Sequence, residues 1–153
     1  MGTRVTAVLG AAALLAAIAA LPAGAEPRPA ASCTNVSGTV SAIGIPVISG
    51  GTLVGFNVIG TGSTGQLGGA INATLTVERA LPSGTLHLSG THNYGSSPAG
   101  AIAVSDRLVV TPSGHITNTS KVVSGGTGFL HTAGTLNATT GVVQLDYHGR
   151  ICN

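Results

Sequence analysis

Apolar and polar residues alternate along much of the chain after residue 33. In residues 71–78 every second side chain is apolar, and the same pattern occurs in residues 84–89 and 143–148. Alternation with a period of two predicts a β-strand with one buried face and one face in water. Thr, Val, Ser and Gly are frequent while strong helix formers are scarce. The pattern therefore predicts an all-β protein.

Clusters of Gly, Pro, Asn and Ser separate the alternating segments and predict turns. The expected strands lie near residues 36–43, 45–49, 52–59, 70–79, 84–92, 101–111, 115–123, 129–136 and 142–151, the first two being either separate or one bent strand. Short connections favour antiparallel hairpins, and a meander of short strands avoids free edges most simply by closing on itself. We therefore expect a closed antiparallel eight-stranded β-barrel, with a two-sheet β-sandwich as the alternative.

The N-terminal segment has the features of a secretory signal peptide. Arg4 precedes an apolar run from Val5 to Leu21, and Ala23-Gly24-Ala25 forms a cleavage site. The run is short for a membrane span and no second run follows, so we expect a secreted protein without a membrane anchor, a retained signal anchor being the alternative. The expected organisation is a signal peptide at 1–25, a flexible leader at 26–32 and a single domain at 33–153.

The two cysteines, Cys33 and Cys152, stand near the two ends of the expected domain. An exported protein meets an oxidising compartment, so a disulfide between them is predicted, with two free thiols as the alternative. Closing so long a loop stabilises the folded state by about 4–5 kcal/mol in the chain-entropy model.

The charge pattern bears on the partners. After the expected cleavage site, five Lys and Arg residues stand against four Asp and Glu residues. The basic residues are scattered and Trp is absent, so the sequence offers neither a phosphate-tracking cluster nor a platform for stacking bases. We expect no nucleic-acid partner.

Gly60, Gly62 and Gly65 have the spacing G-x-G-x-x-G directly after an apolar run, as in dinucleotide-binding loops. That motif requires a helix after the glycines and a parallel sheet around it. Residues 68–77 instead contain two adjacent glycines and several β-branched residues, which disfavour a helix. We interpret the segment as a glycine-rich hairpin loop.

Asp106 shares the phase of the apolar positions in the strand expected at residues 101–111. It should therefore face the lumen, where a carboxylate can act as a general acid or base. His92 and Tyr147 are also in phase with apolar neighbours, and the three side chains are candidate catalytic residues around one ligand. In the alternative interpretation Asp106 lies beyond a bulge and pairs with Arg107 or a neighbouring strand, His92 lies at the rim of the barrel, and Tyr147 is a core residue with a satisfied hydroxyl.

Apolar inward positions of the same strands are the expected contacts of a hydrophobic ligand. They should form the wall of a lumen, as in other barrels of this size that hold one small molecule. These positions are Leu75, Val77, Leu86, Leu88, Val104, Leu108 and Leu145.

The histidines raise the question of a metal site, because His115, His131 and His148 lie on strands expected to be neighbours. The sequence contains no H-x-H or H-x-x-x-H spacing, and no acid accompanies these histidines. A G-x-S-x-G nucleophile elbow is also absent. We therefore expect no metal site, no cofactor and no serine-hydrolase chemistry.

Glycine- and threonine-rich motifs occur at residues 122–129 (VVSGGTGF), 133–136 (AGTL) and 140–147 (TGVVQLDY), and at residues 84–93 (GTLHLSGTHN). With these motifs, the C-terminal part of the chain resembles the allene oxide cyclase-like and dirigent superfamily. The resemblance implies an eight-stranded antiparallel barrel with an apolar lumen, often trimeric, in which plant relatives steer cyclisation or radical coupling of hydrophobic molecules. Phe129 stands where the family usually has a basic residue, so no family catalytic residue is assigned.

Three functions follow as expectations. The first is binding of a small hydrophobic molecule in the lumen. The second is a cyclase or isomerase that uses the lumen to confine a hydrophobic substrate, with Asp106, His92 and Tyr147 as its chemistry. The third is a structural or surface-interaction protein, including a homo-oligomer, whose barrel is filled by side chains.

Overall fold

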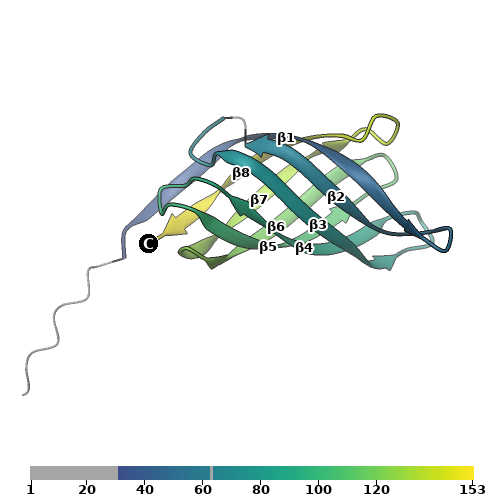
Figure 1. The fold of residues 1–153 in the computed structure, drawn as a ribbon, viewed down its shortest axis with the longest axis horizontal. Helices are drawn as coiled ribbons and strands as arrows, with labels where there is room; N and C mark the ends of the chain where they lie inside the picture. The colour runs from purple at the N-terminus through teal and green to yellow at the C-terminus, as the bar shows by residue number, and fades with distance from the viewer. Residues whose placement is uncertain (1–30, 63) are drawn as a thin grey trace, which may run out of the picture. The chain divides into compact units, whose positions relative to one another are not determined.

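A computed structural model describes residues 31–62 and 64–153, which form a closed barrel of eight antiparallel strands (Figure 1). Each strand pairs with its neighbours in sequence, and the last strand pairs with the first. No helix occurs among the described residues. The strands are β1 (Cys33–Ser49), β2 (Thr52–Gly62), β3 (Gly69–Ala80), β4 (Leu86–Tyr94), β5 (Ile102–Val110), β6 (His115–Ser124), β7 (Thr127–Leu136) and β8 (Val142–Cys152).

The predicted barrel is confirmed, and the sandwich alternative is wrong because β1 and β8 close the sheet. The two segments expected at 36–43 and 45–49 belong to one strand, whose register shifts between Val47 and Ile48. The predicted signal peptide and most of the predicted leader lie outside the described residues.

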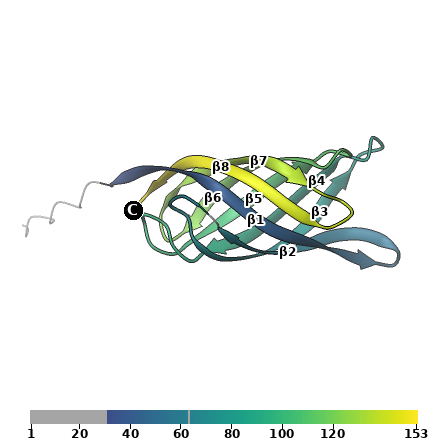
Figure 2. The same cartoon turned by 90° about the horizontal axis from the view of Figure 1, so that it is seen from above.

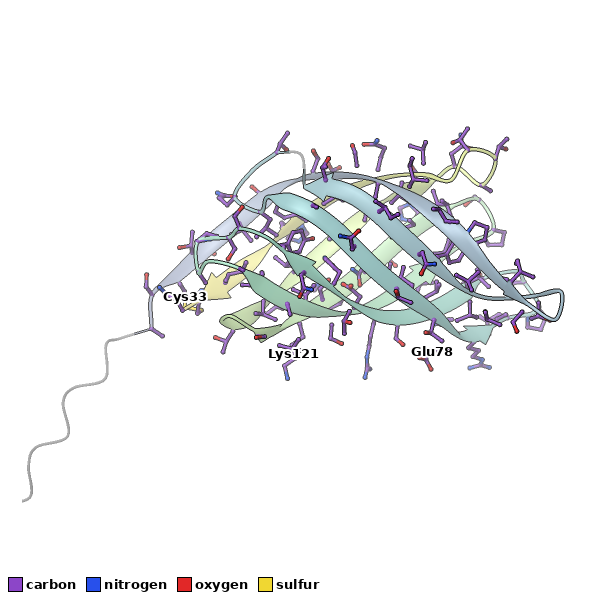
Figure 3. The ribbon with its side chains drawn as sticks, in the orientation of Figure 1. Cys33, Glu78 and Lys121 are labelled. Carbon is purple, nitrogen blue, oxygen red and sulfur yellow. A yellow bond between two sulfur atoms is a disulfide. The ribbon has the colours of Figure 1, made fainter. Side chains whose placement is uncertain are left out.

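Alternation along the strands separates the interior from the surface. In β5 and β6 every second side chain is buried, and the residues between them are partly or fully exposed. Figure 3 shows two of the outward side chains, Glu78 and Lys121, directed away from the barrel wall. The period-two pattern of the sequence thus corresponds to the inner and outer faces of the barrel.

β1 and β8 form the seam of the barrel (Figures 1 and 2). Their ladder runs from Cys33 opposite Cys152 to Ile43 opposite Val142. The two cysteines form a disulfide, as predicted, and 119 positions of sequence separate them. The covalent bond therefore lies at one end of the seam.

The segment between β2 and β3, residues 64–68, covers one end of the lumen, which we call the closed end. Leu67 is 1 % exposed, and the Tyr147 hydroxyl holds the segment by donating to Thr64 O (2.9 Å) and accepting from Leu67 N (3.0 Å). Gly65 has a φ of +89°, and a Cβ there would lie 1.9 Å from Ser37 O. This position therefore needs glycine.

The G-x-G-x-x-G segment is a hairpin connection, as interpreted. Gly60 and Gly62 lie in β2, Gly65 lies in the turn, and the next element is β3 rather than a helix. The geometry of a dinucleotide-binding loop is therefore not formed.

The opposite end of the barrel, which we call the mouth, is a groove lined mainly by apolar residues. It is formed by the turns that join β1 to β2, β3 to β4, β5 to β6 and β7 to β8. Leu86, Val110 and Leu136 line its inner side.

Candidate functional site

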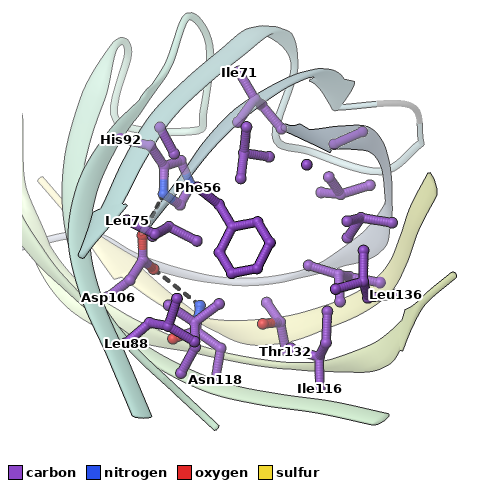
Figure 4. Close-up of a pocket in the computed structure, with 18 of the residues that line it drawn as sticks. Phe56, Ile71, Leu75, Leu88, His92, Asp106, Ile116, Asn118, Thr132 and Leu136 are labelled. Carbon is purple, nitrogen blue, oxygen red and sulfur yellow. Dashed lines mark hydrogen bonds and ion pairs between the residues drawn. The ribbon is translucent and has the colours of Figure 1, made fainter. Parts of the chain in front are cut away.

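A cavity of about 80 Å³ occupies the lumen between the closed end and the mouth (Figure 4). All eight strands contribute to its wall, which consists mostly of aliphatic side chains such as Leu75, Leu88 and Ile116. Asp106, His92, Asn118 and other polar groups interrupt this apolar surface. The cavity therefore combines a hydrophobic wall with a confined polar region, the usual composition of a small-molecule site.

Phe56, a partly buried residue of β2, projects into the middle of the lumen in Figure 4. It lines both the cavity and the groove at the mouth, as do Val110 and Leu136. The phenyl ring therefore stands between the interior space and the mouth.

Asp106 is the centre of the polar region and is only 2 % exposed. Its Oδ2 lies 2.5 Å from His92 Nδ1. Its Oδ1 accepts hydrogen bonds from Asn118 Nδ2 at 2.9 Å and from Ser120 Oγ at 2.5 Å. A buried carboxylate is tolerated when it is paired and hydrogen-bonded, and Asp106 meets both conditions.

His92 connects Asp106 to the cavity. Its Nδ1 is hydrogen-bonded to the Asp106 carboxylate, whereas its Nε2 forms no hydrogen bond with the described residues. With the carboxylate ionised, Nδ1 carries a proton, so Nε2 is an acceptor in the neutral ring and a donor in the protonated ring. The His92 ring also packs edge-on against Tyr94, with ring centroids 4.7 Å apart and an interplanar angle of 70°.

Tyr94 is a buried residue of the cavity wall. Burial raises the pKa of its phenol above the usual value, and the negative charge of Asp106 and the nearby Tyr147 raise it further. Tyr94 is therefore a neutral hydrogen-bonding group over the physiological pH range.

Thr132, on β7, lines the cavity and is 6 % exposed. Its Oγ1 has no hydrogen-bond partner among the described residues. A buried hydroxyl without a partner is costly, so this atom is a free attachment point for a molecule in the lumen.

The predicted catalytic residues separate into two groups. Asp106 and His92 lie together in the lumen. The Asp106 side chain bonds the neighbouring strands β4 and β6, as the alternative interpretation allowed, and not Arg107. Tyr147 is not part of the cavity wall, because its hydroxyl is engaged by Thr64 and Leu67 at the closed end. Its surroundings correspond to the structural alternative of a core tyrosine with a satisfied hydroxyl.

The predicted apolar contacts agree with the cavity in part. Leu75, Leu88, Leu108 and Leu145 line the cavity, and Leu86 lines the mouth. Val104 is fully buried but does not line the cavity, and it lies toward the closed end on β5. Val77 is partly buried against the core, next to the irregularity between β3 and β4, and does not line the cavity either.

Four polar members of the site were not predicted from the sequence: Tyr94, Asn118, Ser120 and Thr132. The alternation of apolar and polar residues along β4 and β6 did contain a signal for these residues. Tyr94 continues the inward phase of His92, and Asn118 and Ser120 lie between the apolar inward positions of β6. Polar residues in an apolar phase indicated the site, but their mutual contacts depend on the register between strands.

Within residues 31–62 and 64–153, no group of three or more His, Cys, Asp or Glu side chains is placed to hold a metal ion. None of the described residues forms a helix that is long and apolar enough to cross a membrane.

The fold and the site together define a class of protein: an eight-stranded antiparallel barrel with a small apolar lumen and a buried aspartate–histidine pair in its wall. No family model, no curated protein and no solved structure matches the chain.

Proposed function

We propose that this protein binds, in its lumen, a small molecule with an apolar body and one hydrogen-bonding group. The unpartnered hydroxyl of Thr132 in the wall of an otherwise apolar cavity is the observation that carries the proposal. His92 supports it, because its Nε2 is the ring nitrogen that remains for a ligand.

The size of the cavity limits the ligand. An engineered cavity of about 150 Å³ holds a benzene molecule, whereas the lumen here has about 80 Å³. A ligand of benzene size therefore requires displacement of Phe56, whose ring lies between the cavity and the mouth (Figure 4). The same displacement opens a path for entry.

The charges of the wall favour a neutral ligand. Asp106 and His92 form the acid–base pair of the cavity wall, and each already bonds the other. A carboxylate ligand would meet a second negative charge in a medium that screens it weakly. A carbonyl or hydroxyl group is therefore the polar group that best suits Thr132 and His92.

We also propose that the protein is exported and related to the allene oxide cyclase-like and dirigent superfamily. The disulfide is compatible with an oxidising compartment. The closed eight-stranded barrel is the fold that the resemblance implies. Assembly into a homo-oligomer belongs to the same proposal.

The proposal is tested with a matched pair of probes, cyclohexanone and cyclohexane, which differ in one carbonyl group. We expect cyclohexanone to shift the methyl resonances of Leu75, Leu88 and Val110. Thr132→Val should weaken cyclohexanone binding about two- to tenfold, the net worth of one hydrogen bond, without affecting cyclohexane. Nuclear magnetic resonance titration measures both.

A second variant provides the control for access. Phe56→Ala should tighten the binding of both probes, because it enlarges the lumen without touching the polar region. If neither probe shifts the lumen resonances in the wild type or in Phe56→Ala, the binding function is wrong and the barrel is a filled structural scaffold. Where the probes do bind, native mass spectrometry of protein purified from its source identifies the natural ligand.

A second candidate function is acid–base catalysis on the bound molecule, as in an isomerase or cyclase. The contact of His92 with Asp106 at 2.5 Å favours it, because a carboxylate orients the imidazole and stabilises its protonated form. Asp106→Asn should retain cyclohexanone binding but lower turnover of the natural ligand by about 100-fold or more. Unchanged turnover in this variant would exclude the catalytic function.

A further inference from the structure

His131 and His148 form a pair on the outer surface, away from the lumen. They lie directly opposite each other on β7 and β8, which are adjacent strands in Figures 1 and 2. Both are exposed, and their ring centroids are 5.6 Å apart with an interplanar angle of 32°. Two imidazoles are therefore held side by side by the register of the sheet.

The separation of the rings matches chelation of one metal ion. A metal bonded to a nitrogen of each ring at about 2.0–2.1 Å lies roughly 3.2 Å from each ring centroid. Ligand–metal–ligand angles of about 90–120° then place the two centroids roughly 4.5–5.5 Å apart. The observed 5.6 Å lies just beyond this range, so rotation of the side chains brings one nitrogen of each ring to a shared ion.

Neighbouring side chains restrict the rings. Phe129 packs edge-on against His131, with ring centroids 5.4 Å apart, and Thr119 Oγ1 lies 3.5 Å from His131 Nδ1. Asp146 and Arg150 are both exposed and lie two residues before and two residues after His148 on the same face, so their charges offset each other. The restriction of the His131 ring favours a bound ion, because less side-chain freedom is lost on binding.

We propose that His131 and His148 chelate one divalent transition-metal ion on the outside of the barrel. Imidazole nitrogens suit Cu²⁺, Ni²⁺ and Zn²⁺, and Cu²⁺ binds most tightly in the usual order of affinities. Water or an external ligand completes the coordination. The pair joins β7 to β8, so the ion links two neighbouring strands.

This site is separate from the proposed lumen function. His131 and His148 point outward, whereas the adjacent residues Thr132 and Tyr147 are buried on the inner side. Substitution of either histidine therefore leaves the lumen wall intact. The spacing of histidines along the sequence does not reveal the site, because the pair depends on strand register.

The test is titration of the untagged chain, with its disulfide intact, with ZnCl₂ and with Cu²⁺ supplied as its glycine complex. We expect one equivalent to bind per chain, with Cu²⁺ tighter than Zn²⁺. His131→Gln and His148→Gln should each weaken binding by roughly 100-fold, because linking two ligands raises affinity by about 10²–10⁴. Isothermal titration calorimetry measures the affinity and the stoichiometry.

His115→Gln is the matched control, since His115 is an exposed histidine of β6 that lies opposite Thr135 rather than another histidine. It should bind metal as the wild type does, and Zn²⁺ should raise the melting temperature of both but not of His131→Gln. Equal losses in His115→Gln, a stoichiometry of one ion per two chains, or undiminished binding in both pair variants would overturn the proposal.

Discussion

Asp106 illustrates how single residues of the lumen are made compatible with burial. Its carboxylate receives three contacts, one from His92 on β4 and two from Asn118 and Ser120 on β6. Asn118 also donates to Ser120 and accepts from the Arg107 backbone. Each bond satisfies a group that water can no longer reach, so the polar region is ordered before any ligand arrives.

Tyr94 gives a pH prediction at the residue scale. Its pKa is raised in the folded state by burial and by Asp106, so the folded protein retains a phenolic proton that the unfolded chain loses above about pH 10. The stabilisation is complete below that pH and is lost as the pH rises toward the folded pKa. Between the unfolded and the folded pKa, Tyr94 should therefore lower the free energy of unfolding by about 1.4 kcal/mol per pH unit.

Denaturant unfolding at a series of pH values from 9 upward measures this slope. Tyr94→Phe should make the slope of unfolding free energy against pH shallower by about 1.4 kcal/mol per pH unit, because phenylalanine does not titrate. A slope that is the same in the variant and the wild type would show that Tyr94 ionises equally in both states. Tyr147 is the only other tyrosine in the sequence, so the absorbance of tyrosinate can be assigned.

At the scale of elements, each strand has one face toward the lumen and one face toward the outer surface. β7 directs Thr132 into the cavity and His131 to the surface, and β8 directs Tyr147 inward and His148 outward. A shift of one residue in register would exchange these faces. The lumen and the surface pair therefore depend on the same ladder between β7 and β8.

The closed end gives a prediction for one connecting segment. Tyr147→Phe removes the hydroxyl that bonds Leu67 N and Thr64 O, while the ring stays packed. The loss of these contacts should reduce the free energy of unfolding by about 1–3 kcal/mol. Hydrogen exchange at the Leu67 amide should accelerate, because that amide loses its acceptor.

The matched control is Tyr94→Phe, which also removes a buried tyrosine hydroxyl but leaves the contacts of residues 64–68 in place. Leu67 should remain protected in that variant. Equal protection of the Leu67 amide in Tyr147→Phe and the wild type would contradict the role of Tyr147 as the anchor of the closed end.

For the whole molecule, the sequence predicted the features that depend on local alternation. The strands, the closed barrel and the inward direction of Asp106 and His92 all follow from a period of two. The disulfide was predicted from the positions of the two cysteines, and the register of β1 with β8 places them opposite each other.

Contacts that depend on register or on a folded-back loop could not be predicted. Tyr147 has the phase of a lumen residue, yet residues 64–68 fold over the end of the barrel and engage its hydroxyl. Val104 is likewise inward and fully buried, yet it does not line the cavity. Alternation determines which face a side chain occupies, whereas its depth along the barrel axis is set by strand stagger.

The bond between Cys33 and Cys152 turns the chain from residue 33 to residue 152 into a covalent ring. One proteolytic cut in any exposed turn opens the ring but frees no fragment, since both new ends stay attached through the sulfur atoms. Release of a piece requires a second cut or a reductant. A protein built this way stays one covalent molecule after the first nick and gains only the mass of the water that hydrolyses the peptide bond.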